Sequence, residues 1–227
     1  MKPTRKPSVR DRLLDVAEDV FGKRGYDASS LEEIAGAIGI GASAIYRHYR
    51  NKMALYEAVV DRLARRHLAS LESFEPEING VEFSGRNFRY HAEHPALARI
   101  VVQASIAGGE QRRIVVEKLI QPAFRYCNQK MRRSALVSAR ELVRNPSHYM
   151  AFVSLMYGYV NLAPLFRDAV GFDPLAEWAV SDGVDIVEKF AWSLNQEAEE
   201  GFARHLEQRV ARPEAPTTRR AARGRNR

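Results

Sequence analysis

The spacing of the apolar residues constrains this chain most, because it follows the repeat of an α-helix along almost the whole sequence. The first apolar stripe consists of Val9, Leu13, Val16, Ala17, Val20 and Phe21. Lys23 and Arg24 follow in the last turn, where cations suit the helix dipole, and Gly25 can adopt a left-handed helix cap. No segment shows a convincing alternation of apolar and polar residues, which would predict a β-strand. The sequence therefore predicts an all-α protein.

Two short helices joined by a glycine-containing turn are predicted within residues 31–50. Ser30 and Glu33 form a capping-box pattern, in which the Ser30 hydroxyl accepts from the Glu33 amide and Glu33 reaches back. Ala35 is small enough for a close helix crossing, and Gly39 tolerates the positive φ that the turn requires. The apolar residues that would fix the interhelical angle are Ile34, Ile38, Ile40 and Ile45. This is a helix-turn-helix, whose second helix can enter the major groove of DNA.

Residues 10–63 resemble the N-terminal DNA-binding domain of the TetR family of transcriptional regulators. The resemblance is carried by Phe21, Arg24-Gly25-Tyr26, Ser29-Ser30, Ile34-Ala35, Gly39-Ile40, Ile45-Tyr46, His48-Tyr49, Lys52 and Leu55. It covers about a quarter of the chain, and the rest matches the family only in length and helicity. It implies a three-helix N-terminal DNA-binding domain and a larger helical C-terminal domain that dimerises and often encloses an effector pocket.

The resemblance also implies which residues contact DNA. Phosphate contacts would come from Ser29, Ser30, Tyr46, His48 and Lys52. Base contacts would come from the exposed positions of the second helix of the motif, which are Gly41, Ala42, Ser43, Ala44 and Arg47. These positions depart from the usual family pattern, in which a capping Ser precedes a polar residue and a Gly-Thr pair. We therefore expect sparse direct readout, through Arg47, Ser43 and alanine methyl groups, with DNA shape or the basic N-terminal arm contributing to operator choice. In a purely structural interpretation, Tyr46 packs beneath the helix and Arg47 and His48 are ordinary surface residues.

Charge and composition divide the chain into five predicted regions. These are a basic arm (1–8), the helix-turn-helix domain (9–50), a connecting helix (51–74), an effector-binding and dimerisation domain (75–211) and a disordered basic tail (212–227). Formal net charge is +4 over residues 1–70, −2 over residues 71–211 and +5 over the tail. Basic ends around a slightly acidic middle suit a protein whose ends meet a polyanion, although charged tails also serve solubility alone.

Five helices are predicted after the connecting helix, at residues 82–93, 95–108, 110–132, 147–168 and 174–208. Pro122 falls inside the third of these and predicts a kink or a break there. Wide apolar faces on the last two helices predict a dimer interface that includes Leu155, Val160, Trp178, Val187, Phe190 and Leu194. Aromatic and flexible side chains nearby predict a pocket for an apolar or aromatic small molecule, lined by Phe88, His91, Phe124, Met131, Phe152, Met156 and Tyr159. The alternative is that these residues form a simple core.

The remaining features exclude several classes of protein. Cys127 is the only cysteine, which excludes an internal disulfide framework and fits a reducing compartment. Residues 149–166 carry no formal charge, but Ser154, Asn161 and Pro164 argue against a membrane span. No metal, phosphate-loop or hydrolase motif is present, so we expect no cofactor, no metal and no enzymatic activity. The sequence thus predicts a cytoplasmic, dimeric repressor of a pseudo-palindromic operator on double-stranded DNA. The alternative is a DNA-binding protein of the same fold without a small-molecule ligand, controlled by a partner protein or architectural.

Overall fold

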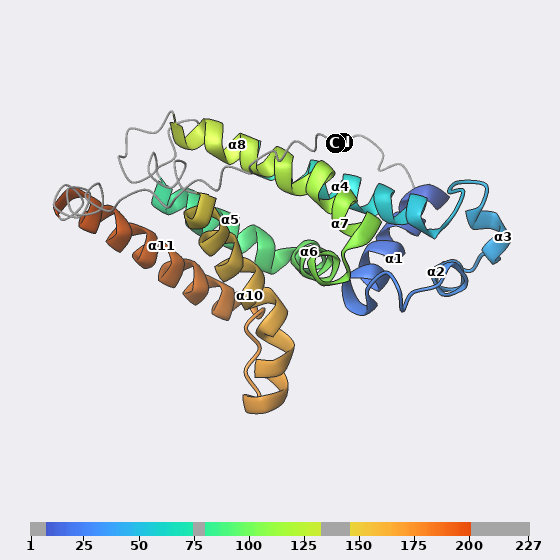
Figure 1. The fold of residues 1–227 in the computed structure, drawn as a ribbon. Helices are drawn as coiled ribbons and strands as arrows, with labels where there is room; N and C mark the ends of the chain where they lie inside the picture. Colours follow the sequence, from blue (N-terminus) through green and yellow to red (C-terminus); the bar gives the residue numbers. More distant parts are fainter. Residues whose placement is uncertain (1–7, 75–79, 133–145, 201–227) are drawn as a thin grey trace, which may run out of the picture.

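The computed structural model describes residues 8–74, 80–132 and 146–200, and all regular structure in these residues is helical (Figure 1). The prediction of an all-α fold is therefore confirmed. The elements are α1 (Val9–Arg24), α2 (Leu31–Ala37), α3 (Ala42–Ile45), α4 (Lys52–Glu72), α5 (Gly80–Glu93), α6 (Pro95–Ala107), α7 (Gly109–Val115), the π-helical turn η1 (Val116–Ile120), α8 (Gln121–Arg132), α10 (Pro146–Val170) and α11 (Glu177–Glu200).

Helix α1 has a cap at each end that the sequence supplies locally. Ser8 and Asp11 form a complete capping box at its start, which the sequence analysis did not identify. Gly25 ends the helix, as the stop signal predicted, and its amide donates to the Phe21 carbonyl. Its φ of 80° is positive, but its ψ of 169° lies outside the left-handed helical region that was predicted for the cap. The buried face of α1 therefore begins and ends at positions that the chain fixes without tertiary contacts.

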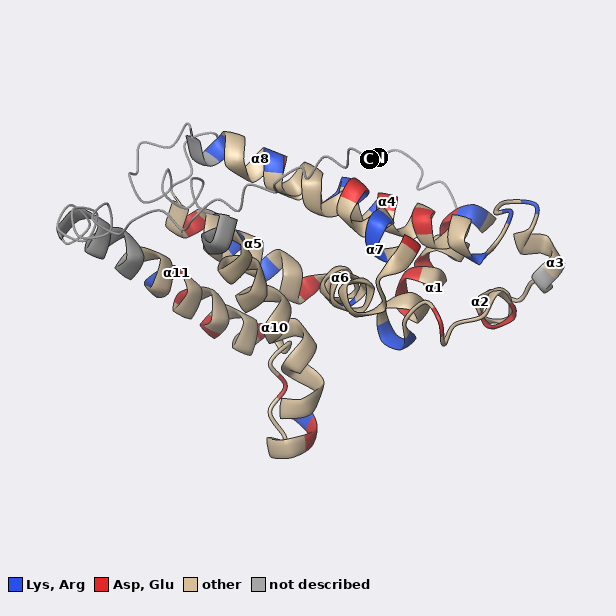
Figure 2. Ribbon diagram, viewed as in Figure 1, with Lys and Arg blue, Asp and Glu red and all other residues tan. Residues whose placement is uncertain are grey.

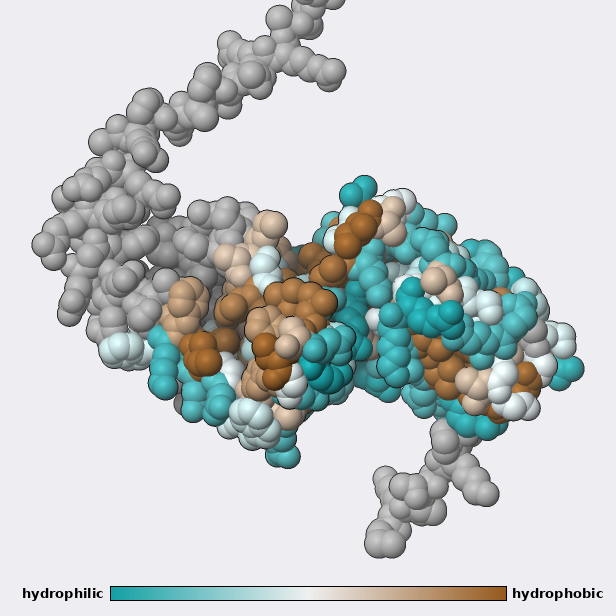
Figure 3. Space-filling model, turned by 90° about the horizontal axis from the view of Figure 1, so that it is seen from below, coloured by the Kyte–Doolittle hydropathy of each residue, from teal (hydrophilic) through white to brown (hydrophobic). Residues whose placement is uncertain are grey.

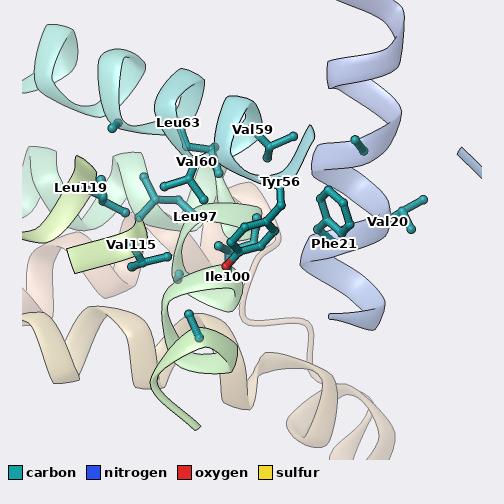
Figure 4. Close-up of a cluster of buried hydrophobic side chains, with 14 of the residues drawn as sticks. Val20, Phe21, Tyr56, Val59, Val60, Leu63, Leu97, Ile100, Val115 and Leu119 are labelled. Atoms are coloured by element: carbon teal, nitrogen blue, oxygen red, sulfur yellow. The ribbon is translucent and has the colours of Figure 1, made fainter. Parts of the chain in front are cut away.

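A single hydrophobic core joins the N-terminal helices to the C-terminal ones. Phe21 of α1, Tyr56 and Leu63 of α4 and Ile100 of α6 all point into it (Figure 4), and each is at most 2% exposed. Helices α1 and α6 approach closely, since a Cβ added at Gly22 would lie 3.1 Å from the Ala96 Cβ. Because these helices share one core, movement of α4 or α6 is transmitted to α1 by packing.

A π-helical turn interrupts the predicted helix 110–132 just before Pro122, the residue at which a kink or a break was predicted. Residues 116–120 form a π-helical turn, in which the Gln121 amide donates to the Val116 carbonyl five residues earlier. Pro122 follows at once and cannot supply the amide that an α-helix needs at that position. The wider turn absorbs the mismatch in the hydrogen-bond ladder, and α8 continues to Arg132.

Helices α10 and α11 leave much apolar surface uncovered, although α11 packs on α5 and α10 packs on α6 and α5. The C-terminal part of α10 extends away from the other helices (Figure 1), and in the view from below apolar residues gather over these two helices (Figure 3). Residues 149–170 are long and apolar enough to cross a bilayer, with 22% of the most apolar window buried. A single long apolar helix such as α10 is also typical of a dimer interface in a water-soluble protein. Helix α11 starts at Glu177 rather than at the predicted residue 174, because Pro174 lies in the preceding turn.

Candidate nucleic-acid interface and C-terminal core

The α2–α3 unit is held by a cap, a turn and a small buried core. The Ser30 hydroxyl accepts from the Glu33 amide at 3.0 Å, and Gly39 has a φ of 74° in the turn. Ile34, Ala35 and Ile45 are fully buried, as the helix-turn-helix pattern requires. The other half of the predicted capping box is absent, because the Glu33 carboxylate pairs with Arg24 at 2.6 Å instead of reaching back. The ion pair ties α2 to the end of α1.

Helix α3 and the turn that follows it present the residues predicted to contact DNA, and Arg47 lies in this turn rather than on the helix itself. Gly41, Ser43, Tyr46, Arg47 and His48 are exposed. Tyr46 is 56% exposed, so it does not pack beneath the helix, and Tyr49 is the aromatic residue that is buried there. Ala44 is half-buried, and the side chain of Ala42 lies outside the described side chains.

Lys52 is bound mainly to the protein's own backbone. Its ammonium donates to the carbonyls of Tyr26 at 2.8 Å and Ser29 at 2.9 Å, and it lies 4.2 Å from the centre of the Tyr26 ring. An ammonium has three N–H donors, so at most one remains for a phosphate. Lys52 therefore connects the start of α4 to the loop between α1 and α2.

Ser29 also has a structural role that the sequence did not predict. Its side chain is 5% exposed, and its hydroxyl donates to the Gly25 carbonyl. That hydroxyl is therefore committed to the loop, which corrects its assignment as a hydroxyl donor to phosphate. Ser30 is half-buried and uses its oxygen as the cap of α2. An open, shallow hollow lies between α2, the end of α3 and the start of α4. It is lined by Ser29, Ser30, Leu31, Glu32, Tyr46, Asn51 and Lys52.

Two basic residues of the helix-turn-helix domain lie outside the set predicted to contact DNA through its helices: Arg50 after α3 and Arg10 at the start of α1. Figure 2 shows basic residues between α3 and the start of α4, where Arg47 and Arg50 are exposed. Arg10 lies at the start of α1, and its guanidinium donates to the Tyr49 hydroxyl at 3.4 Å, which raises the pKa of Arg10. The signal for Arg50 was available, because it directly follows the motif and precedes the Asn51 cap of α4.

A Lys52→Met variant tests the role of this lysine in the loop. We expect it to lower the free energy of unfolding by about 2 kcal/mol, because two carbonyls lose a charge-assisted donor. Thermal unfolding measures this loss. Lys23→Met is the matched control, since Lys23 is 62% exposed and pairs only with exposed Asp19 among the contacts described. It should change stability by less than about 0.5 kcal/mol. Equal effects of the two substitutions would contradict the assignment.

Comparison with known proteins identifies this arrangement. Residues 13–59 match the family described as "Bacterial regulatory proteins, tetR family". The chain is 28% identical over 175 residues to the HTH-type transcriptional repressor Rv3405c of Mycobacterium tuberculosis, covering 76% of this chain and 83% of that protein. It is also 42% identical over 53 residues to the HTH-type transcriptional activator FasR of Mycolicibacterium smegmatis, covering 23% of this chain and 24% of FasR.

A solved structure extends the similarity over both halves of the chain. The fatty acid degradation regulator FadR from Bacillus halodurans superposes with a TM-score of 0.59 at 17% identity, covering 83% of this chain and 96% of that one. At this identity the likeness shows a common fold. The chain belongs to the TetR family. It is therefore a transcriptional regulator with a helix-turn-helix DNA-binding domain.

In this TetR-family protein, only part of the predicted effector pocket comes together. The Phe88 and Tyr159 rings are in contact, with centroids 4.8 Å apart, and Met156 accepts a hydrogen bond from Asn87 at 3.6 Å. Phe152 is half-buried against the same core. The described ring contact of Phe124 is with Tyr149, at the other end of α10, so Phe124 is not grouped with Phe88 by any described contact. The side chain of Met131 lies outside the described side chains.

A buried polar cluster, which we call the histidine cluster, lies where α4, α5 and α10 meet. It consists of His67 on α4, Asn87, Tyr90 and His91 on α5, and Tyr157 on α10. His67 and His91 are 4% and 2% exposed, and their ring centroids are 4.9 Å apart. Burial lowers the pKa of His67 to about 4, with the hydrogen bond that its Nε2 donates to Asn87 partly opposing the shift, and burial lowers the pKa of His91 well below its usual value. Both imidazoles are therefore neutral at pH 7.

The residues predicted for the dimer interface divide into two groups. Leu155, Trp178 and Phe190 are 43%, 61% and 51% exposed. Val160 and Val187 are 1% and 2% exposed, because they pack in the protomer's own core, so their assignment to the interface is corrected. The sequence could not separate the two groups, since both lie on helices that are apolar on more than one face. The side chain of Leu194 lies outside the described side chains.

Proposed function

We propose that the protein is a cytoplasmic, homodimeric repressor that binds a pseudo-palindromic operator and is released from it by a small apolar or aromatic effector. The observation that carries the DNA-binding part is the exposed outer face of α3, fixed to the core by Ile34 and Ile45. Repression is supported by Rv3405c, a repressor that is similar over most of both chains, whereas the similarity to the activator FasR covers only about 53 residues.

The proposed DNA contacts fall into two classes. Tyr46, His48 and Arg50 supply donors for phosphate oxygens, together with the amides at the start of α2 and the remaining donor of Lys52. Arg47 and Ser43 are the proposed base readers, because a guanidinium can bond two guanine acceptors in the major groove. Gly41, Ala42 and Ala44 would allow close approach of α3 to the base edges.

Dimerisation and effector binding are assigned to the C-terminal helices. A second copy of the chain is proposed to cover the exposed apolar face of α10 and α11, which would place two α3 helices about one DNA turn apart. The effector is proposed to bind between α5 and α10, near Phe88, His91, Phe152, Met156 and Tyr159. Release of DNA then requires the effector to favour one spacing of the α3 helices over another.

The base-reading role of Arg47 has a direct test. Arg47→Ala should reduce the ratio of operator affinity to random-DNA affinity by about tenfold, because it removes a contact that depends on the base. Arg50→Ala is the matched control, and we expect it to weaken both DNAs by a similar factor. Fluorescence anisotropy at two salt concentrations measures both ratios. Equal losses on operator and random DNA for Arg47→Ala would remove Arg47 from the base readers.

The repressor assignment as a whole is tested on the protein's own gene. A footprint over the flanking DNA should show a protected site with two-fold symmetry. A panel of apolar aromatic compounds should then be screened for one that abolishes protection. A protected site that no compound releases would favour control by a partner protein.

A further inference from the structure

Three buried polar atoms of the histidine cluster have no hydrogen-bond partner among the described residues. They are Nδ1 of His67, Nδ1 of His91 and the hydroxyl of Tyr90. Buried polar groups in folded proteins are almost always hydrogen-bonded, and each one left unpaired costs free energy. Three such atoms within one set of ring contacts indicate a place where another molecule completes the hydrogen bonds.

The hydrogen bonds of Asn87 determine what His67 offers to that molecule. The Asn87 amide nitrogen donates to Met156, so its oxygen faces His67 Nε2 at 3.3 Å. A carbonyl oxygen only accepts, so the proton of the neutral imidazole lies on Nε2 and Nδ1 carries a free lone pair. His67 therefore requires a donor from its ligand. The Tyr90 hydroxyl is able to donate or to accept.

The surroundings of the cluster disfavour a permanently charged ligand. The buried polar side chains of the cluster, His67, Asn87 and His91, carry no fixed charge. Arg66 and Glu18, which act on the pKa of Tyr90 with opposite signs, are paired with each other at 3.1 Å. A carboxylate or an ammonium would lose its hydration without gaining a counter-ion there. The aromatic rings of Tyr90 and Tyr157 contact the two imidazoles, and they favour a flat, apolar body.

We propose that the histidine cluster binds an uncharged aromatic molecule that carries a hydroxyl group, with the hydroxyl donating to Nδ1 of His67. This rests on the proposed function, because it names the chemical class of the effector. It also places the ligand on α4, the helix whose first residue, Lys52, holds the α1–α2 loop. His67 lies fifteen residues along α4 from Lys52, about 22 Å at 1.5 Å per residue. A ligand that shifts His67 therefore moves the helix that carries the DNA-binding loop.

Three matched probes test the proposal on the full-length protein: 2-naphthol, its methyl ether 2-methoxynaphthalene, and 2-naphthoate. Calorimetric titration should show 2-naphthol binding about tenfold more tightly than the ether, which cannot donate, and more tightly than the anion. The variant His67→Phe keeps a ring of similar size but lacks the acceptor, so its preference for naphthol over the ether should fall to within about twofold. His94→Phe is the control, because Nδ1 of His94 already bonds to the Tyr90 carbonyl at 2.9 Å. It should keep the full preference.

A spectroscopic readout covers the case in which His67→Phe fails to fold. The ¹⁵N resonance of His67 Nδ1 in the unaltered protein should move on addition of 2-naphthol and not on addition of the ether. Equal affinity of the protein for both probes, a naphthol preference that survives in His67→Phe, or no binding of either probe would overturn the proposal and leave water as the partner of these atoms. Operator release is measured separately. If other aromatic compounds release the operator whether or not they carry a hydroxyl group, only the proposed chemical class of the effector is contradicted. If 2-naphthol binds as expected but does not release the operator, only the effector function of the site is contradicted.

Discussion

A glutamate in place of Ile186 is expected to convert the protein to monomers and to weaken operator binding by at least about a hundredfold. Ile186 is 65% exposed on α11, and Trp178 and Phe190 lie two turns before and one turn after it on the same face. Exposed apolar residues gathered on one helix face, with only Asp182 between Trp178 and Ile186 in this row, mark an interface in a water-soluble protein. A carboxylate at its centre would be buried without a partner in both copies, at a cost of several kcal/mol. The monomer would keep one α3 and lose the benefit of binding two half-sites together.

Light scattering after size exclusion, and operator titrations of the same samples, measure the two effects. Ile106→Glu is the control, because it makes the same substitution at an isoleucine that is 81% exposed on α6, outside α10 and α11. This control should remain dimeric with unchanged operator affinity. Since Ile186 contributes little to the protomer core, the Ile186→Glu monomer should retain its helical circular dichroism. If Ile186→Glu still forms dimers at low protein concentration, the interface lies elsewhere.

The N-terminal domain could be predicted because its signals are local. Caps, a positive-φ glycine and helical spacing each involve residues within a few positions of one another, and the positive φ of Gly25 and of Gly39 is as expected. The roles of Ser29 and Lys52 could not be predicted in the same way. They depend on carbonyls of the α1–α2 loop, which only the folded chain brings to the start of α4.

In the C-terminal half, the individual helices could be predicted from the sequence, whereas their arrangement could not. Its helices were predicted because periodicity reveals them, but their mutual arrangement depends on long-range packing. A Cβ at Gly183 would lie 2.6 Å from the Phe88 ring, and a Cβ at Gly85 would overlap the Glu188 side chain, so these two glycines allow α11 to pack closely on α5. His67 was overlooked, although its position carried a signal: it lies four residues from Leu63 and from Leu71, on the buried stripe of α4. A histidine in an apolar stripe indicates a buried imidazole with a specific partner or role.

The histidine cluster also leads us to expect that acid destabilises the protein well above the pH at which carboxylates titrate. Burial lowers the pKa of His67 to about 4 and that of His91 well below 6.5, so both stay neutral in the folded state. The unfolded chain binds a proton at each imidazole as the pH falls through about 6.5. Stability is therefore fully present above that pH and is lost as the pH falls, until the folded pKa is reached. Between pH 7.5 and pH 5 the loss should be about 2 kcal/mol for each histidine, or about 4 kcal/mol together.

Denaturant titrations at a fixed protein concentration across this pH range measure the loss, since the stability of a dimer depends on concentration. His91→Phe removes one imidazole while keeping a buried ring beside Tyr157, so it should remove about half of the loss. His48→Gln is the control for the loss of a histidine, because His48 is exposed on the DNA-binding face, outside the buried cluster. Asp11 and Asp173 have lowered pKa values through hydrogen bonds from Ser8 and Arg167, so their contributions are lost only at lower pH. If His91→Phe loses stability with acid as steeply as the parent does, the two imidazoles are not held neutral in the core.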